Sequence, residues 1–212
     1  MRLYLASTSP ARLALLRQIS IEPTIVPSFV DEDAAVVAAE AANGPLSAPE
    51  LVCLLARLKA EAVLEALPGG ERIDGFILGG DSAFEFDGAI YGKPHLPDVA
   101  RERWQRYRGR SGVLHSGHWM IDHRIADSPF PAVGAVTSAR VEFAADISDA
   151  EIDSYVASGE PLEVAGAFTI DGLAAPFISS ITGAPSTVIG MSLPTLRDLA
   201  VRLGVTVGDF RA

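Results

Sequence analysis

The stretch that decides the fold is Gly79-Gly80-Asp81-Ser82-Ala83-Phe84-Glu85-Phe86-Asp87-Gly88-Ala89-Ile90-Tyr91-Gly92-Lys93-Pro94. The run of residues 73–78, which is apolar except for Asp74, comes directly before it and is typical of a buried strand. Asp87-Gly88 predicts a tight hairpin turn, after which the chain returns toward Lys93. A carboxylate on a strand and a lysine beyond a turn are residue types that hold a metal ion and a phosphate, although the same pattern fits a surface hairpin with ordinary charges.

The composition narrows the class of protein. The chain has 212 residues, 49% of them apolar, but no apolar run approaches the roughly 20 residues that cross a bilayer. Residues 1–7 do not form a signal-peptide pattern, and the single Cys53 excludes an internal disulfide and predicts a small core residue, so we expect a cytoplasmic protein with no membrane partner. The net charge of −10 argues against long nucleic acid as a partner, yet it permits a small metal-bound anion.

Four histidines are spread over residues 95–123. His115 and His118 are three residues apart in a predicted strand, so their side chains should point to opposite faces. Because no pair of cysteines accompanies them, the sequence argues against a zinc site.

Strand and helix signals alternate along the chain and predict an α/β fold with a mixed sheet in a single domain over residues 1–212. Strands are expected at residues 2–6, 24–27, 73–78 with the following hairpin, 113–122, 133–143 and 177–181. A first helix is expected to start at Ser9-Pro10. A second should run from the capping box at residues 47–50 to Leu67 and stop at Pro68-Gly69-Gly70. Further helices are expected at residues 96–107, 148–158 and 194–203. Loops are expected at residues 28–33, at Asp127 to Pro131 and at residues 160–171, with residues 187–190 continuing from a turn toward the last helix. The Ala-rich residues 34–46 fit either a helix or a mobile segment.

Four features of the sequence suit phosphate chemistry. The turn Ser7-Thr8-Ser9-Pro10-Ala11-Arg12 combines free amides at a helix start with hydroxyls and a guanidinium, which together favour an anion. Asp31-Glu32 follows a strand and provides carboxylates of the kind that hold Mg²⁺ or Mn²⁺. Lys59 on a helix and Asp81 with Lys93 complete the set. Each feature alone fits an ordinary capped helix, solvated loop or surface charge.

The order of these features resembles the Maf family of nucleoside triphosphate pyrophosphatases. The matching residues are Leu5-Ala6-Ser7-Thr8-Ser9-Pro10 with Arg12, Asp31-Glu32, Leu55-Ala56 with Lys59-Ala60, Gly80-Asp81-Ser82 with Asp87-Gly88 and Gly92-Lys93-Pro94, Gly109-Arg110, Ser158-Gly159-Glu160-Pro161, Ala165-Gly166-Ala167-Phe168, and Ile181-Thr182-Gly183 with Val188-Ile189-Gly190-Met191. The resemblance covers nearly the whole chain, and several motifs in register are far more specific than any one.

The resemblance implies an elongated mixed sheet flanked by helices, with two lobes around a central cleft, a fold shared with inosine-triphosphate pyrophosphatases. It also implies an enzyme, a hydrolase that cleaves the α–β phosphoanhydride of standard or modified nucleoside triphosphates to a monophosphate and diphosphate, as housecleaning of the nucleotide pool. A divalent metal, Mg²⁺ or Mn²⁺, and a homodimer are further expectations from the family.

The residues can be assigned roles consistent with that reaction. Asp81 is expected to act as the general base that orients or deprotonates water and to contact the metal, with Glu32 as the second metal contact. The residues expected to hold the triphosphate are Ser7, Ser9, Arg12, Lys59 and Lys93.

Three departures from the family pattern bear on substrate choice. Ala11 stands where many members have the first of two arginines, and Ser82 stands where threonine is common. Asp171 takes the place of a glutamine carried by members that prefer dTTP and UTP. Because a carboxylate only accepts hydrogen bonds, Asp171 predicts a base edge rich in N–H donors, such as guanine or 7-methylguanine.

Two other functions fit parts of the sequence. One is a nucleotide-binding regulator linked to cell division and septum formation, which has kept the fold with weak turnover, and Ala11 is its main support. The other is an α/β enzyme of a different phosphate class. The presence of Asp81, Glu32, Lys59 and Lys93 together favours the pyrophosphatase.

Overall fold

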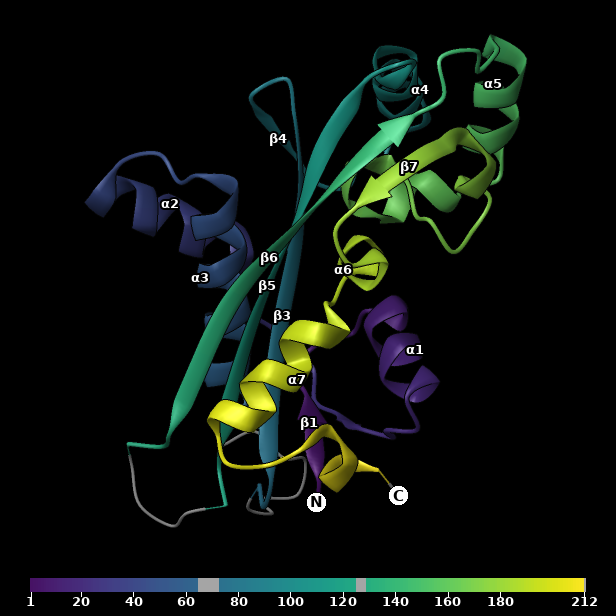
Figure 1. The fold of residues 1–212 in the computed structure, drawn as a ribbon. Helices are drawn as coiled ribbons and strands as arrows, with labels where there is room; N and C mark the ends of the chain where they lie inside the picture. Colours follow the sequence, from purple (N-terminus) through teal and green to yellow (C-terminus); the bar gives the residue numbers. More distant parts are fainter. Residues whose placement is uncertain (65–72, 125–128, 212) are drawn as a thin grey trace.

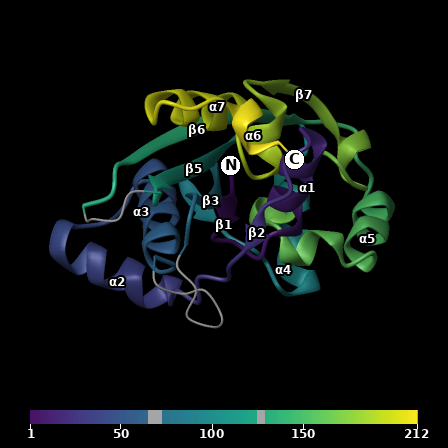
Figure 2. The ribbon, with the colours of Figure 1, turned by 90° about the horizontal axis from the view of Figure 1, so that it is seen from below.

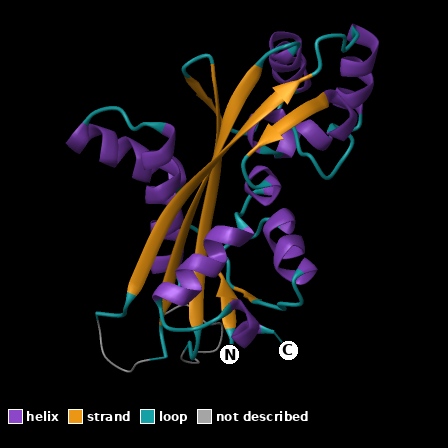
Figure 3. Ribbon diagram, viewed as in Figure 1, coloured by secondary structure: helices purple, strands orange, loops and turns teal. Residues whose placement is uncertain are grey.

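The computed structural model describes residues 1–64, 73–124 and 129–211. Its helices and strands alternate along the chain, and Figures 1 and 3 show them arranged around one long twisted sheet. The strands are β1 (Leu3–Leu5), β2 (Thr24–Ile25), β3 (Phe76–Phe86), β4 (Ala89–Tyr91), β5 (Ser111–Asp122), β6 (Ala132–Phe143) and β7 (Ile178–Thr182). The helices are α1 (Pro10–Gln18), α2 (Glu32–Asn43), α3 (Ala48–Glu61), α4 (Pro97–Tyr107), α5 (Asp149–Ala157), α6 (Pro185–Ile189) and α7 (Leu193–Arg202).

The predicted mixed α/β sheet is confirmed. The strands follow the order β2-β1-β3-β5-β6-β7, and β4 pairs with β3 outside this path. β1 runs parallel to β2 and β3, because α1 and the later helices return the chain across the sheet, whereas the long strands β3, β5 and β6 are antiparallel neighbours. The predicted turn at Asp87-Gly88 joins β3 to β4, with both residues at positive φ.

The helices cover both faces of the sheet. Alternate residues of β1 and β3 point to opposite sides, so that Leu5 and Leu78 pack with α1 and α7, while Tyr4 and Ile77 pack with α3. Figures 1 and 2 show α2 and α3 on one side and α1, α6 and α7 on the other. Within the described residues, no helix combines the length and apolar character that a membrane crossing needs.

A third apolar cluster lies toward the end of the sheet where α4 and α5 gather (Figure 1). It is rich in aromatic side chains, with Phe84 and Phe143 from the sheet packed against Trp104 and Tyr107 of α4. One long sheet therefore carries apolar clusters toward both of its ends, in agreement with the two lobes that the family resemblance implies.

Helix α3 approaches the sheet unusually closely. A Cβ atom at Gly79 of β3 would lie 2.1 Å from the carbonyl oxygen of Ala56, a distance at which the two cannot coexist. Glycine at this position therefore allows the backbones of α3 and β3 to meet. Lys59 lies on the same buried face of α3 as Leu55 and Ala56, so the close approach places a lysine against the sheet.

Several predicted boundaries were wrong. Residues 28–33 are not all loop, because Asp31 is the N-cap of α2, its carboxylate accepting from the Ala34 amide at 3.0 Å, and Glu32 is in the first turn. Helix α3 ends at Glu61, before the predicted Leu67. Leu67 and Pro68-Gly69-Gly70, like Asp127 at the start of its predicted loop, lie outside the described residues.

Other local differences lie in the last third of the chain. Residues 160–171 contain two short 3₁₀ turns instead of an irregular loop. Residues 187–190 were expected only to continue from a turn toward the last helix, whereas residues 185–189 form the separate helix α6. Cys53 is half-buried, not a core residue. None of these differences changes the order of the sheet.

Candidate active site

The candidate site lies where the edge of β3 has no strand beside it. Residues 76–78 of β3 pair with β1 and residues 84–86 pair with β4, whereas the described pairings leave 79–83 open on that edge. The chain leaves β1 toward this gap and continues into α1, and it leaves β4 toward the same gap before Lys93. The topology thus directs two separate loops to the middle of β3, where Asp81 lies.

One face of β3 carries a cluster of opposite charges. The Lys59 ammonium lies 2.7 Å from a carboxylate oxygen of Asp81 and 2.7 Å from one of Glu32. The side chains of Lys59 and Asp81 are only 10% and 12% exposed, while that of Glu32 is 47% exposed. A buried lysine therefore joins one buried and one accessible carboxylate, which come from a strand and a helix 49 positions apart in the sequence.

The surroundings of Asp81 suit a proton acceptor. Burial raises the pKa of Asp81, and the positive charges of Lys59 and Arg12 oppose this effect. The hydrogen bond from Lys59 is made to Oδ1 of Asp81. The second carboxylate oxygen is thus the one that can accept from water or bind a cation.

The opposite face of β3 holds Arg12. Because successive residues of a strand point to opposite sides, Ser82 lies on the face away from Asp81. The Arg12 guanidinium donates to Ser82 Oγ at 3.1 Å, to Ser7 Oγ at 3.1 Å and to the Gly190 carbonyl at 2.9 Å. Burial lowers the pKa of Arg12, against the opposing charges of Asp81 and Glu32, but an arginine remains charged near neutral pH.

The remaining predicted residues are placed as follows. Ser9 caps α1, its Oγ accepting from the Arg12 amide at 3.4 Å, and its own amide donates to Ser7 Oγ at 3.2 Å. Lys93 is 52% exposed, and its ammonium lies 3.7 Å from a carboxylate oxygen of Glu163. This described ion pair therefore involves neither Asp81 nor Glu32.

The three positions linked to substrate choice lie in different surroundings. Ala11 is half-buried on α1, and Ser82 contacts Arg12 and Ser116 on β5. Asp171 is exposed and accepts a hydrogen bond from the Thr169 hydroxyl. Ser82 therefore bonds to the buried guanidinium, whereas the carboxylate of Asp171 lies at the surface and its described bond is to the neighbouring Thr169.

The site offers two carboxylates for a metal ion. In the residues that the structure describes, no group of three or more histidine, cysteine, aspartate or glutamate side chains could hold one. Mg²⁺ commonly binds proteins through only one or two carboxylates and takes its other ligands from water and substrate phosphates. Glu32 and Asp81, which share Lys59, fit that donor set.

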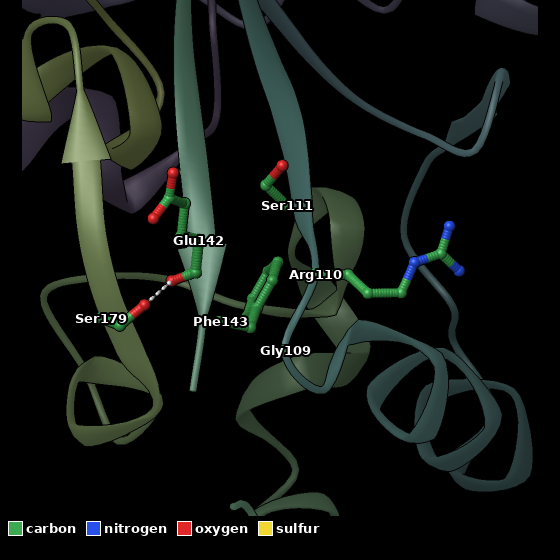
Figure 4. A pocket seen from close by; sticks show the side chains of 6 residues that line it. All are labelled: Gly109, Arg110, Ser111, Glu142, Phe143 and Ser179. Atoms are coloured by element: carbon green, nitrogen blue, oxygen red, sulfur yellow. Dashed lines mark hydrogen bonds between the residues drawn. The ribbon is translucent and has the colours of Figure 1, made fainter. Parts of the chain in front are cut away.

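A separate pocket lies between β5, β6 and β7 (Figure 4). Figure 4 shows the Ser179 hydroxyl donating to the Glu142 carbonyl, at 3.1 Å, and the Arg110 side chain pointing away from the hollow. Arg110 instead pairs with Asp87. None of the predicted site residues lines this pocket, so it is distinct from the Asp81 site.

The fold and this edge define an α/β protein with paired carboxylates and cations at the centre of a mixed sheet. The family model described as Maf-like protein matches residues 2–203, so the chain belongs to the Maf family, as the sequence motifs had indicated.

Similar proteins carry one common description. A protein of Leifsonia xyli subsp. xyli described as nucleoside triphosphate pyrophosphatase is 66% identical over 205 residues, covering 97% of this chain and 94% of that protein. Proteins with the same description from Salinispora tropica and Mycobacterium sp. (strain JLS) are 49% and 44% identical and cover 98% and 97% of this chain and 86% and 96% of their own length.

The sequence did not indicate which residues of other elements contact Arg12 and Ser82 on their face of the sheet. Ser116 and the Gly190 carbonyl meet Ser82 and Arg12 only because β5 pairs with β3 and α6 packs against that face. No local turn joins β3 directly to β5, so the register that brings Ser116 opposite Ser82 had no signal in the sequence.

Proposed function

We propose that this protein is a nucleoside triphosphate pyrophosphatase, which adds water to a nucleoside triphosphate and releases the monophosphate and diphosphate. The observation that carries the proposal is the Glu32–Lys59–Asp81 cluster beside the buried Arg12, in a chain that belongs to the Maf family. The proposal includes a single functional domain over residues 1–212, a cytoplasmic location and a homodimer, as the family resemblance implies.

The proposed role of Asp81 follows from its surroundings. Its raised pKa increases its basicity, and the hydrogen bond from Lys59 fixes Oδ1, so Oδ2 accepts a proton from the water that attacks the α-phosphorus. Water then adds to phosphorus as the bond to the bridging oxygen breaks, and diphosphate leaves with the electron pair of that bond.

Glu32 and Asp81 would hold Mg²⁺ or Mn²⁺, and such an ion supplies neutralisation of phosphate charge and a lower pKa for bound water. The chain's own cations act on the phosphates. Arg12 and Lys59 are buried, so their attraction to the growing negative charge of the leaving diphosphate is weakened little by water.

Base preference in this proposal depends on Asp171. Its exposed carboxylate accepts hydrogen bonds from the N–H groups of guanine or 7-methylguanine, and it has no donor for the carbonyl groups of thymine or uracil. A substrate panel in which dTTP and UTP are clearly best would contradict this assignment.

The proposal is tested by incubating the purified protein with standard and modified triphosphates, with Mg²⁺ or Mn²⁺ and with a chelator. We expect equal amounts of monophosphate and diphosphate with either metal and none with the chelator. In ¹⁸O-labelled water the label should enter the monophosphate, because the attack is on the α-phosphorus.

Two results would count against the proposal. Release of a nucleoside diphosphate and phosphate would indicate a different phosphatase class. Tight nucleotide binding with no product from any triphosphate would support the regulatory function instead.

A further inference from the structure

The segment from α6 to the start of α7 is fixed to β5 at two points. Ser116 Oγ donates to the Thr187 carbonyl at 2.9 Å, and the Ser192 amide donates to His118 Nε2 at 2.8 Å. Ser116 and His118 are two residues apart on β5, so they project from the same face. This is the face of the sheet that carries Ser82 and Arg12, because Ser116 pairs with Ser82 across the strands.

Between these two points, the segment presents a carbonyl to Arg12. The Gly190 carbonyl accepts from Arg12 Nε at 2.9 Å and from Ser82 Oγ at 3.3 Å. Gly190 has a φ of 134°, a conformation that other residues rarely adopt, so the direction of this carbonyl depends on glycine. The described hydrogen-bond acceptors of the guanidinium are all uncharged, and the Gly190 carbonyl is one of the three that fix its direction.

His118 can hold the segment only in one protonation state. Because the Ser192 amide donates to Nε2, that nitrogen has a free lone pair, and the proton of the neutral ring is on Nδ1. Nδ1 itself is buried and has no partner of ordinary hydrogen-bond geometry among the described residues, although the backbone of Ala135 and Ser116 lies close enough to the ring to oppose the fall of its pKa. Burial and the positive charge of Arg12 lower the pKa of His118 to about 4, which keeps the ring neutral at physiological pH.

We propose that His118 is a positioning residue for the pyrophosphatase reaction: its neutral ring holds the α6–α7 turn so that the Gly190 carbonyl orients Arg12 toward the phosphates. The inference rests on the proposed function, because it gives Arg12 a phosphate to bind. His118 does not touch the substrate in this arrangement. It acts through Ser192, Gly190 and Arg12, in that order.

The test compares two variants of His118 in two backgrounds. His118→Leu removes the acceptor and keeps an apolar volume, whereas His118→Gln restores an acceptor oxygen. We expect His118→Leu to raise KM for the triphosphate about tenfold with a smaller change in kcat, and His118→Gln to recover most of that loss. In an Arg12→Lys background, His118→Leu should change KM less than twofold, because coupled residues are not additive.

A pair of glycine variants separates positioning from general stability. Gly190 and Gly204 both have positive φ, but Gly190 faces Arg12 whereas a Cβ on Gly204 meets nothing within 4 Å. Gly190→Ala should raise KM about as much as His118→Leu, and Gly204→Ala should leave KM within twofold. Equal effects of the two glycine variants on KM, or equal effects of His118→Leu in both Arg12 backgrounds, would overturn the proposal.

A spectroscopic measurement covers the case in which a variant does not fold or the proposed reaction is absent. ¹⁵N NMR of the wild-type protein at pH 7 should show a neutral His118 ring protonated at Nδ1, and slow exchange of the Arg12 Nε proton. A ring protonated at Nε2, or a rapidly exchanging Arg12 Nε proton, would overturn the proposal even if the enzyme is active. If these signals are as expected but no diphosphate is released, the proposed function fails and the local geometry stands.

Discussion

The two faces of β3 place charges in different ways. On the α3 face, Lys59 is neutralised by two carboxylates, one of them half exposed. On the α1 face, Arg12 is buried and donates to two hydroxyls and a carbonyl. Asp81 and Ser82 are consecutive in the sequence, yet one belongs to the ionic face and the other to the neutral one.

This difference leads us to expect that the two faces of β3 have different roles in the proposed reaction. A carboxylate that is paired with a lysine can also accept a proton or bind a metal ion, because the lysine can turn to a phosphate when the ion pair opens. The described hydrogen-bond acceptors of Arg12 are uncharged, and its positive charge, on which the carboxylates of Asp81 and Glu32 also act, can attract an arriving phosphate. The chemistry is therefore expected on the Asp81 face and fixed electrostatic binding on the Arg12 face.

The largest expected effect comes from the ionic face. Asp81→Asn keeps the shape of the side chain but removes the proton acceptor, so kcat should fall by about 10²- to 10⁴-fold while KM changes little. Steady-state kinetics with Mg²⁺ measures both. Glu85→Gln is a matched control, because Glu85 lies on the same face of β3 and bonds His115 instead of Lys59. Turnover near the wild-type value in Asp81→Asn would show that the base lies elsewhere.

A second prediction concerns the neutral face and its dependence on pH. The folded pKa of His118, about 4, is below the ordinary 6.5, so the unfolded chain binds more protons between these values. Stability should therefore fall as the pH falls through this window, with a loss on the order of 2 kcal/mol between pH 7 and pH 5. Urea unfolding at the two pH values measures it.

The raised pKa of Asp81 acts in the opposite direction, because a group that is easier to protonate when folded gains stability as the pH falls. The same two unfolding measurements on His118→Gln separate the contribution of His118 from that of Asp81, since this variant keeps Asp81 and lacks the titrating ring. If wild type and His118→Gln lose equal stability between pH 7 and pH 5, the ring of His118 is not held neutral by the fold.

The smallest expected effect on kinetics is that of Lys93, which follows β4 near the open edge of β3. Lys93 is half exposed, so water and salt weaken its attraction to a phosphate, and Lys93→Ala should raise KM about three- to tenfold with Lys93→Arg close to wild type. A second measurement on Lys93 uses the fact that Lys59 and Lys93 are the only lysines in the sequence, so the acylated side chains are easily told apart. A bound triphosphate should protect Lys93 from acylation by an amine reagent, as read by mass spectrometry. Unchanged labelling at saturating triphosphate would place Lys93 outside the site.

The local sequence was sufficient for most helices and strands. Ser9-Pro10 predicted the start of α1, the capping box at Ser47 predicted the start of α3, and Asp87-Gly88 predicted the hairpin. These signals work because each depends on hydrogen bonds or backbone angles within a few residues. Asp31 caps α2 in the same local way, but the acidic residues around it are equally typical of a loop, which is why the predicted loop at residues 28–33 includes the start of α2.

The sequence by itself determined the residue types of the candidate site and, through the order of its motifs, the family. Only the tertiary structure decided which of those residues meet: Lys59 bridges Asp81 and Glu32, while Arg12 lies on the other face with Gly190. The reason is that strand register and helix packing join positions up to 178 residues apart, and no short-range rule fixes either.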